Sequence, residues 1–469
     1  MSYGSPVRPL VLLASSVIGC GPVHAASRTQ PPAVAATHVA IAPPLAPVTP
    51  SSGADPHAVL VLRNARVFDG SGAAPRDDID ILVHGDRIAE VGPDLTVPPG
   101  ARIIDVGGRT LLPGFIDAHV HLGFSPQASH DAGVADAVRS SDADLALRGA
   151  GNARRTLLAG FTTVRNVGGS LADRSLRDAI VRGDVVGPRM LVANHSIGIT
   201  GGHCDGGNGL HPDVFAGRSG PASGIADGVD EVRRAVRQQI KLGADVIKVC
   251  ATGGVLSQGD GVGNAQMTAD ELRVAVEEAT RADRRVAAHA HGNAGIRAAI
   301  AAGVHSIEHG SVLDAETVAM MRKAGTYLVP TLLAGREVEA MANAGTISAE
   351  SAAKARAIAP RMRESFALAV RGGVKIALGS DAGVFAHGTN GQEFVEMVAA
   401  GMSPQAALTA GTGAAADLLG RTDVGRIAVG AYADMVVVDG DPLRDITVVT
   451  APQLVLKGGV LHVTPAWAQ

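Results

Sequence analysis

The chain has 469 residues, with 41 Lys and Arg against 45 Asp and Glu, so its formal net charge is −4, and 46% of its residues are hydrophobic. This composition is typical of a mildly acidic globular protein and argues against a nucleic-acid binder that depends on bulk positive charge. At roughly 100 to 200 residues per domain the length allows two or three domains, although one α/β barrel often exceeds about 250 residues.

The first 26 residues have the pattern of an export signal. One arginine lies near the start, an apolar segment follows, and small residues end in Val23-His24-Ala25, which predicts cleavage after Ala25 or Ala26. The apolar segment is far shorter than the ~20 residues that a membrane-spanning helix needs.

A second interpretation of the same segment stays open. Val17-Ile18-Gly19-Cys20 resembles a relaxed bacterial lipobox, in which Cys20 would be lipidated and would anchor the chain to a membrane. Residues 27–57 are rich in Pro and Ala and predict a linker. Both interpretations imply export, to the periplasm or the medium, or as an outer-membrane lipoprotein.

Residues 58–112 alternate apolar and polar side chains between frequent turn residues, which predicts antiparallel strands. The same pattern returns over residues 421–463. We therefore expect a small β-sandwich domain that is built from both ends of the chain.

Residues 113–420 alternate strand-like runs with Ala-rich helical stretches, which predicts an α/β fold of the (β/α)8 TIM-barrel type. Helix starts are marked by Thr268 with Glu271 three residues later, and by Ser403 before Pro404. The eight expected strands cover residues 115–122, 162–168, 189–197, 245–251, 285–291, 306–310, 327–332 and 375–383.

Several of these strands end in polar side chains. In GFIDAHVHLG, His119 and His121 share one face of the strand, together with Asp117. An isolated H-x-H is more often a half-buried strand, but later strands repeat the pattern. The ends of the expected strands carry His119, His121, Lys248, His289, His291, His309 and Asp381.

Imidazole and carboxylate are the ligands that catalytic zinc prefers, and this set exceeds what one tetrahedral ion uses. Two divalent metal ions are therefore expected, provided that an anion bridges them. Lys248 has no lone pair to offer as an ammonium. Inside a barrel it must be paired, have a lowered pKa, or be modified.

The motifs PGFIDAHVH, IKVCATGGV, VAAHAHG, SIEHGS and ALGSDAG resemble the binuclear amidohydrolase superfamily. They are most similar to its Xaa-Pro dipeptidase (imidodipeptidase) branch, which includes ochratoxin-hydrolysing amidases. The resemblance spans residues 58–463.

The resemblance implies that Lys248 is N6-carboxylysine and that its carbamate bridges two Zn²⁺ ions. His119, His121 and Asp381 would hold one ion, and His289 and His309 the other. A bridging water would attack the amide, and Asp381 would transfer its proton to the leaving amine.

The resemblance also suggests substrate contacts. His291 matches a substrate-side histidine, and His203 in TGGHCDGG matches a similar TGGH run, where it would contact a substrate carbonyl or carboxylate. Val255 and Leu256 could line the substrate pocket or act as ordinary loop anchors. Cys204 stands where the family is expected to have a small residue, usually glycine. Independently of the resemblance, Cys204 and Cys250 are interpreted as small buried residues, because Cys250 lies in an apolar strand-like run, and a bridge between them is the less favoured alternative.

The leading hypothesis is a zinc-dependent, dipeptidase- or carboxypeptidase-like amidohydrolase. It would release an amino acid with a free carboxylate from dipeptides, N-acyl amino acids or ochratoxin A, which would yield ochratoxin alpha and phenylalanine. A deaminase or cyclic-amide hydrolase of the same superfamily is the alternative.

A Schiff-base aldolase that uses Lys248 and a non-catalytic binding protein are less consistent with the complete ligand set. The expected partner is a small molecule or dipeptide and not a nucleic acid. By the resemblance the chain is expected to form a homo-oligomer.

Overall fold

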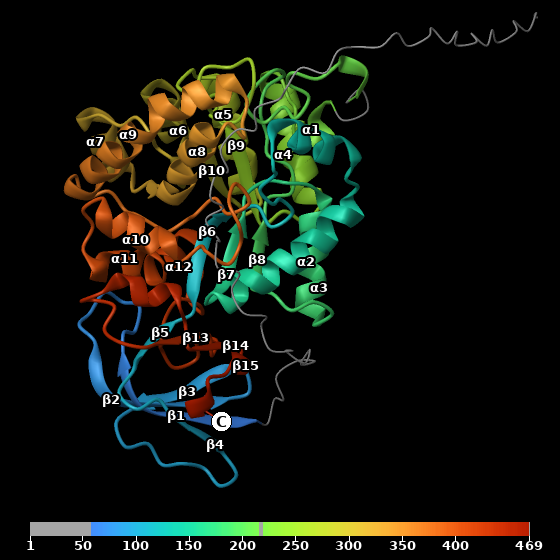
Figure 1. Cartoon of the computed structure of the whole chain (residues 1–469). Helices are drawn as coiled ribbons and strands as arrows, with labels where there is room; N and C mark the ends of the chain where they lie inside the picture. The colour runs from blue at the N-terminus through green and yellow to red at the C-terminus, as the bar shows by residue number, and fades with distance from the viewer. Residues whose placement is uncertain (1–57, 215–218, 469) are drawn as a thin grey trace, which may run out of the picture. The chain divides into compact units, whose positions relative to one another are not determined.

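In the computed structural model, which describes residues 58–214 and 219–468, strands from both ends of this range form one eight-stranded sheet (Figure 1). Its strands follow the order β15-β14-β13-β5-β1-β2-β3, and β4 pairs with β1 off this path. They are β1 (Val59–Val67), β2 (Arg76–His84), β3 (Arg87–Gly92), β4 (Arg102–Asp105), β5 (Thr110–Pro113), β13 (Met435–Val438), β14 (Leu454–Lys457) and β15 (Val460–Val463).

The sheet is mixed rather than purely antiparallel. β1 pairs antiparallel with β2, but β4 and β5 both run parallel to β1. The expectation of antiparallel strands alone is therefore wrong. After the β2–β3 hairpin the chain returns to pair with β1 and now runs in the same direction as β1. The alternation of apolar and polar residues does not indicate the direction of a strand.

Seven parallel strands of the barrel belong to two sheets, in the orders β6-β7-β8 and β12-β11-β10-β9. They are β6 (Phe115–Val120), β7 (Phe161–Asn166), β8 (Arg189–Val192), β9 (Val246–Cys250), β10 (Arg285–Ala290), β11 (Ser306–His309) and β12 (Tyr327–Val329). Each lies within two residues of its predicted start.

The eighth predicted strand, at residues 375–383, does not form a regular ladder. It joins the barrel through isolated bridges from Ile376 to Leu328 and from Ala382 to Val120, and a further bridge from Ile197 to Val249 connects the two parallel sheets. These bridges close the ring of strands. The left-handed backbone of Asp381, with φ of 63°, interrupts the extended conformation that a continuous strand would need.

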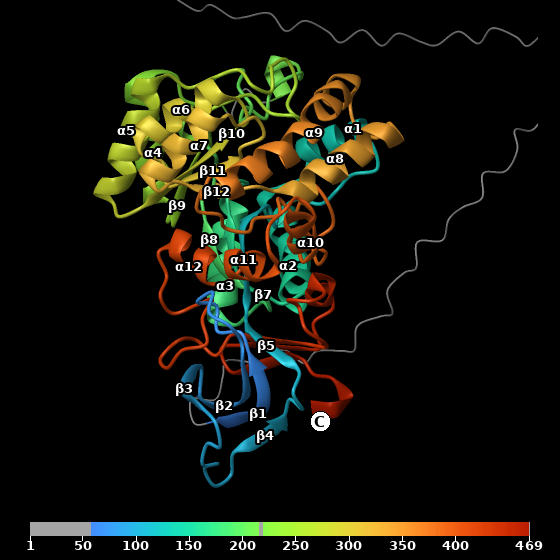
Figure 2. The same cartoon turned by 90° about the vertical axis from the view of Figure 1, so that its left-hand side faces the viewer.

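Helices surround the barrel (Figure 2). They are α1 (His130–Arg139), α2 (Asp142–Leu158), α3 (Leu171–Arg182), α4 (Gly228–Lys241), α5 (Ala269–Arg281), α6 (Asn293–Ala302), α7 (Ala315–Ala324), α8 (Leu332–Ala344), α9 (Ala349–Arg371), α10 (Gln392–Ala399), α11 (Pro404–Ala410) and α12 (Gly413–Leu419). Short 3₁₀ turns lie at Pro212–Val214, Pro221–Ser223, Ile446–Thr450 and Ala466–Ala468.

Both predicted helix starts are confirmed. Thr268 and Glu271 form the two reciprocal bonds of a capping box before α5, and Ser403 caps α11 with Pro404 in its first turn. Among the described helices, none has the length and apolar character needed to cross a membrane. The predicted export signal, Cys20 and the linker at residues 27–57 lie outside the described residues.

Candidate functional site

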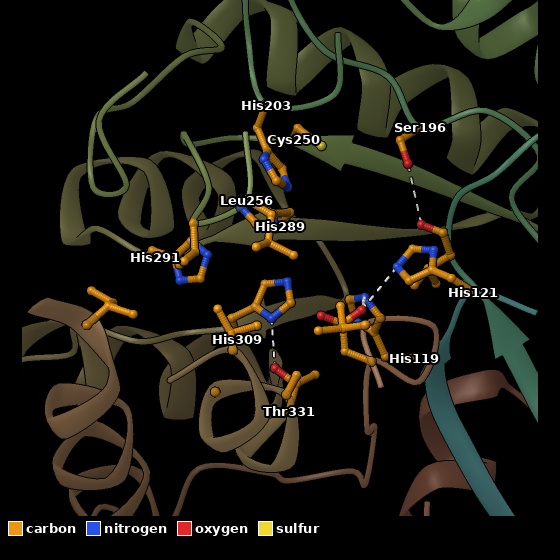
Figure 3. Close-up of a pocket in the computed structure, with 18 of the residues that line it drawn as sticks. His119, His121, Ser196, His203, Cys250, Leu256, His289, His291, His309 and Thr331 are labelled. Atoms are coloured by element: carbon orange, nitrogen blue, oxygen red, sulfur yellow. Dashed lines mark hydrogen bonds and ion pairs between the residues drawn. The ribbon is translucent and has the colours of Figure 1, made fainter. Parts of the chain in front are cut away.

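The ten residues predicted for the site line one cavity at the carboxyl ends of the barrel strands (Figure 3). The empty volume of the cavity is about 970 Å³, which includes the part that is open to solvent. The residues are His119, His121, His203, Lys248, Val255, Leu256, His289, His291, His309 and Asp381. The barrel thus brings together side chains that lie up to 262 residues apart, from 119 to 381.

His119 near the end of β6 and His121 directly after it both reach the cavity. The Nδ1 atom of His119 lies 2.8 Å from Glu308 Oε2, and the Nδ1 atom of His121 lies 2.7 Å from the Gly168 carbonyl oxygen. In both residues the oxygen accepts a hydrogen bond from Nδ1–H, so Nε2 carries no hydrogen and keeps its lone pair. These Nε2 atoms lie 3.5 Å and 3.2 Å from Asp381 Oδ1, which is the arrangement of a metal-ligand triad.

A second group of imidazoles lies on β10 and β11. His291 Nδ1 is 2.7 Å from Ser311 Oγ and His309 Nδ1 is 2.7 Å from Thr331 Oγ1, and Figure 3 shows the latter bond. Ligand atoms of His289, His291 and His309 all lie within 4.8 Å of one another. The same holds for His119, His309 and Asp381, so His309 stands between the two groups.

Three residues of the site adopt a left-handed backbone. His309, Thr331 and Asp381 have φ values of 71°, 50° and 63°. Such values are uncommon for residues other than glycine and are concentrated at functional sites. They turn the chain sharply at the ends of neighbouring strands and place these side chains at the cavity.

Burial favours the neutral form of four imidazoles, those of His119, His289, His291 and His309. It lowers the pKa of His119 to about 4 and that of His291 to about 3, and it lowers the pKa of His289 and His309 well below the usual range. Burial would raise the pKa of Asp381, but His119 and His121 outweigh it and the pKa is lowered. Neutral imidazoles and a carboxylate are the donors that zinc and similar divalent ions bind, so the residues fit such ions.

Lys248 lies on β9 with only 3% of its surface exposed. Burial lowers the pKa of its ammonium to about 8, although Glu308 and Asp381 act in the opposite direction. The Lys248 side chain lines the same cavity as the imidazoles and Asp381, so its amine lies among groups of metal-ligand type.

The sequence analysis missed Glu308 and Arg165. Both are buried, and Arg165 Nη2 donates to Glu308 Oε1 at 2.8 Å. Burial would raise the pKa of Glu308, but Arg165 and His119 hold it down at about 2. Glu308 therefore orients His119 as an ionised acceptor. The only signal in the sequence is a charged residue directly before His309, inside an otherwise apolar strand.

Asp117 is a structural acceptor rather than a ligand. Its oxygens accept hydrogen bonds from the backbone N–H groups of His119 and Ser380, and from the Asn390 amide at 2.8 Å. These bonds tie β6 to the irregular eighth strand.

The interpretation of the cysteines as separate buried residues is wrong. Cys204 and Cys250 form a disulfide, with their Cα atoms 6.1 Å apart. The segment after β8 runs alongside β9, where Ile197 exchanges backbone hydrogen bonds with Lys248 and Cys250. The barrel thus brings together two residues that are 46 positions apart.

One wall of the cavity is apolar. Ala334, Gly335 and Val338 of α8 face Ala355, Ile358 and Met362 of α9, and Phe124, Val255 and Val384 extend this wall. Val255 also packs against the hydrophobic core, whereas Leu256 is 42% exposed. We call the nine residues other than Leu256 the apolar wall. Val255 serves both as a loop anchor and as part of this wall.

Comparisons with known proteins are consistent with this geometry. The model of the amidohydrolase family matches residues 110–461. An ochratoxinase from Aspergillus niger is 35% identical over 432 residues, which cover 87% of each chain. A crystal structure of a Xaa-Pro dipeptidase with bound methionine in the active site matches with a TM-score of 0.81 and 37% identity, covering 86% of this chain and 99% of that one. The crystal structure of A. niger ochratoxinase matches with a TM-score of 0.78 and 33% identity, covering 88% and 98%.

Proposed function

Because the chain belongs to the amidohydrolase family, we propose that it hydrolyses an amide bond whose leaving group is an amino acid with a free carboxylate. Dipeptides, N-acyl amino acids and ochratoxin A are the candidate substrates. The observation that carries the proposal is the convergence of six imidazoles, one aspartate and one buried lysine on a single cavity.

Two divalent ions, most simply zinc, would be held by these side chains. His119, His121 and Asp381 are proposed for one ion, and His289 and His309 for the other, with Lys248 between them. The close grouping of His291 with His289 and His309 supports a place for His291 at the edge of the second ion, where it would also meet substrate. The bound ions would lower the pKa of a water molecule and polarise the scissile carbonyl.

Lys248 is proposed to carry a carbamate. Its uncharged amine would attack the carbon of CO2, forming the N–C bond and releasing one proton to solvent. The resulting carboxylate would replace a buried cation by an anion next to the imidazoles. This removes the repulsion between an ammonium and divalent ions.

Asp381 is proposed to move the proton. Its carboxylate lies within 3.5 Å of the Nε2 atoms of His119 and His121 and faces the cavity. It can accept a proton from the attacking water and return it to the leaving nitrogen. Without this proton the nitrogen would have to depart as an amide anion, which is a poor leaving group. The backbone N–H of Asp381 donates to the His119 carbonyl oxygen at 2.7 Å, which fixes the position of this residue beside His119.

The apolar wall supports an apolar group on one side of the scissile bond. Alanine, valine and isoleucine side chains offer no hydrogen bonds, so binding there depends on the apolar area that is buried. The related proteins named dipeptidase and ochratoxinase are consistent with such a substrate. We rank N-acyl phenylalanines and apolar dipeptides above polar ones.

The test uses the full chain incubated with zinc and bicarbonate. Amino-acid release from dipeptides, N-acyl amino acids and ochratoxin A is followed by mass spectrometry, with and without a chelator. Chelator-sensitive release supports the proposal.

The Lys248→Ala variant provides a sharper arm of this test. It should lose activity, and a short carboxylic acid such as propionate should restore part of it by supplying the missing carboxylate. No release from protein that holds two metal ions per chain would contradict the proposal and would favour a deaminase or cyclic-amide hydrolase.

Export is proposed independently from residues 1–26, and mass spectrometry of the mature N-terminus would distinguish cleavage after Ala25 or Ala26 from lipidation at Cys20.

A further inference from the structure

The segment between β9 and α5 forms a loop that is closed at its base. The backbone N–H of Gly253 donates to the Asn264 carbonyl oxygen at 3.0 Å, and that of Gln266 donates to the Ala251 carbonyl oxygen at 2.9 Å. A compact loop whose two ends lie side by side in this way is an Ω-loop. We call residues 253–264 the Ω-loop.

The tip of the Ω-loop forms part of the cavity. Val255 and Leu256 both line it, and Figure 3 labels Leu256. Val255 also packs against an apolar cluster that includes Val338 of α8 and Ala355 of α9. The apolar wall therefore has one part on the α8–α9 pair and another on the Ω-loop, so the position of the loop determines how much room a substrate group finds there.

Lys354 of α9 ties the tip of the Ω-loop to this helix. Its Nζ atom donates to the Ser257 carbonyl oxygen and to Asp260 Oδ1, both at 2.8 Å. Lys354 also pairs with Glu350, one turn earlier in α9, at 2.9 Å. Glu350 Oε1 in turn accepts a hydrogen bond from the backbone N–H of Gly259 at 3.0 Å. These bonds hold the tip of the loop against α9.

The ion pair at the centre of this link is buried. The side chain of Lys354 is 12% exposed and that of Asp260 is 6% exposed. Burial would lower the pKa of Lys354, but its bonds to Asp260 and Glu350 outweigh it and the pKa is raised. Burial would raise the pKa of Asp260, but Lys354 and Ser257 outweigh it and the pKa is lowered. Both groups keep their charge, so removing one of them leaves the other uncompensated in a buried place.

Asp260 transmits the hold of α9 to the cavity lining. Its Oδ2 atom accepts a hydrogen bond at 3.2 Å from the backbone N–H of Gly254, which directly precedes Val255. Gln266 Nε2 donates to the same oxygen at 3.0 Å, which connects the carboxylate to the base of the loop. The position of Val255 is thereby coupled to that of α9.

We propose that Lys354 is a positioning residue that sets the selectivity of the chain for an apolar substrate group, by holding the Ω-loop against α9. This inference rests on the proposed amide-hydrolase function. With the link formed, an apolar group is enclosed between Val255, Leu256 and the helices. Without it the loop moves away, water enters, and the group loses part of the apolar area that it buries. A group as small as a methyl reaches little of this space and loses little.

The kinetic test compares three dipeptides, Ala-Ala, Leu-Ala and Ala-Leu, on the metal-loaded full chain. The wild-type protein should prefer one of the two leucine dipeptides over Ala-Ala by at least about tenfold in kcat/KM, the size expected for added apolar groups in a closed pocket. The preferred position of leucine identifies the side of the scissile bond that meets the apolar wall.

Lys354→Met should lose most of this preference by raising KM for the leucine dipeptide, with kcat little changed. The lost contacts are made equally before and during the reaction, so they affect binding alone. Lys354→Arg, which keeps the charge and the N–H donors, should restore the preference. Hydrolysis of Ala-Ala should be similar in all three proteins, because its methyl groups depend little on the loop.

Arg363→Met is the matched control. Arg363 lies on the same helix and pairs with Glu396 of α10 at 2.6 Å, but it does not line the cavity. It should keep the leucine preference, whereas a general disturbance of α9 would appear in both variants.

Two kinds of failure are distinguishable. A leucine preference that is absent in the wild type, unchanged in Lys354→Met, or lowered equally in Arg363→Met would overturn the inference and leave the proposed function intact. No hydrolysis of any of the three dipeptides by protein that holds two metal ions per chain would count against the proposed function instead.

A second measurement does not depend on activity. Backbone hydrogen exchange, followed by mass spectrometry, should be faster over residues 254–260 in Lys354→Met than in the wild type, because the N–H groups of the tip lose their fixed acceptors. Lys354→Arg and Arg363→Met should exchange like the wild type over these residues. Equal exchange in the wild type and Lys354→Met would overturn the inference whatever the activity.

Discussion

At the scale of single residues, Glu308 acts on the site through His119 although it does not line the cavity. Its Oε2 atom accepts from His119, and its Oε1 atom accepts from the buried Arg165. We predict that Glu308→Gln weakens metal binding about 10- to 100-fold, because one of these two acceptors becomes a donor and His119 loses its fixed tautomer. It should also destabilise the fold by about 3–5 kcal/mol, since Arg165 keeps its charge in a buried position.

Metal content after dialysis against graded chelator, and urea unfolding, measure the two effects of Glu308→Gln. Glu396→Gln is the matched control: Glu396 is a buried carboxylate that pairs with Arg336 and Arg363 away from the cavity. It should lower stability and leave metal affinity unchanged. Equal metal affinity in both variants would contradict the role given to Glu308.

Gly379 is a second residue on which the site depends. A Cβ atom at this position would lie 2.3 Å from Val329 Cγ1 and 2.8 Å from His119 Cβ. Gly379→Ala should therefore displace β6, cost about 1–3 kcal/mol through overpacking, and reduce metal occupancy.

Gly151→Ala on α2 provides the comparison for Gly379→Ala, because its Cβ would make only an ordinary contact of 3.6 Å with Arg155. It should retain full occupancy and gain about 0.5–1 kcal/mol from helix propensity. Metal analysis and thermal unfolding of the two variants report the difference, and full occupancy in Gly379→Ala would refute the steric argument.

At the scale of elements, α8 is connected to the site through its first turn. Thr331 precedes this helix without capping it and instead bonds His309 through its side chain. The first N–H groups of α8, from Leu332 and Leu333, donate at 2.9 Å and 2.7 Å to Glu393 of α10. The carboxyl group of Glu393 therefore stabilises the helix that supports a proposed metal ligand.

Glu393→Gln should leave one of these buried N–H groups without an acceptor and cost about 1–3 kcal/mol. Thr331→Val removes only the bond to His309, so it should weaken metal binding with a smaller loss of stability. Chemical denaturation and metal titration of both variants separate the two roles. A Glu393→Gln protein that is as stable as the wild type would contradict the capping role.

At the scale of the whole molecule, the sheet from the chain ends is joined to the barrel by polar groups that are partly or fully buried. Arg189 at the start of β8 lies over the Tyr432 ring and pairs with Asp434 at 3.2 Å. Lys457 of β14 donates to the Gly187 carbonyl at 2.7 Å. Burial and the nearby Arg189 lower the pKa of Lys457 to about 8, with Asp434 acting in the opposite direction.

This lowered pKa predicts a pH dependence of stability. Between about pH 8 and the unfolded value of 10.5, the unfolded chain keeps a proton on Lys457 that the folded chain has lost, so stability rises with pH in this window. In this window the free energy of unfolding of the wild type should rise with pH relative to that of Lys457→Met, by at most about 1.4 kcal/mol per pH unit. Urea unfolding at pH 7, 8, 9 and 10 measures the difference, and parallel curves for the two proteins would contradict it.

The sequence by itself determined the alternation of strands and helices and nearly the whole set of candidate ligands. Both are local properties: His119 and His121 share a face because strands have a period of two, and the carboxyl ends of barrel strands meet at one face. Helix starts such as Thr268 with Glu271 were predictable for the same reason, since a cap involves residues three positions apart.

Only the tertiary structure decided the contacts that orient those ligands. Glu308 reaches His119 and Arg165 across the barrel interior, and the Cys204–Cys250 disulfide forms because the loop after β8 lies against β9. The interruption of the eighth strand at Asp381 likewise depends on the left-handed backbone of this residue, with φ of 63°. Such pairings depend on which segment lies over which strand, and no local pattern of side chains encodes that.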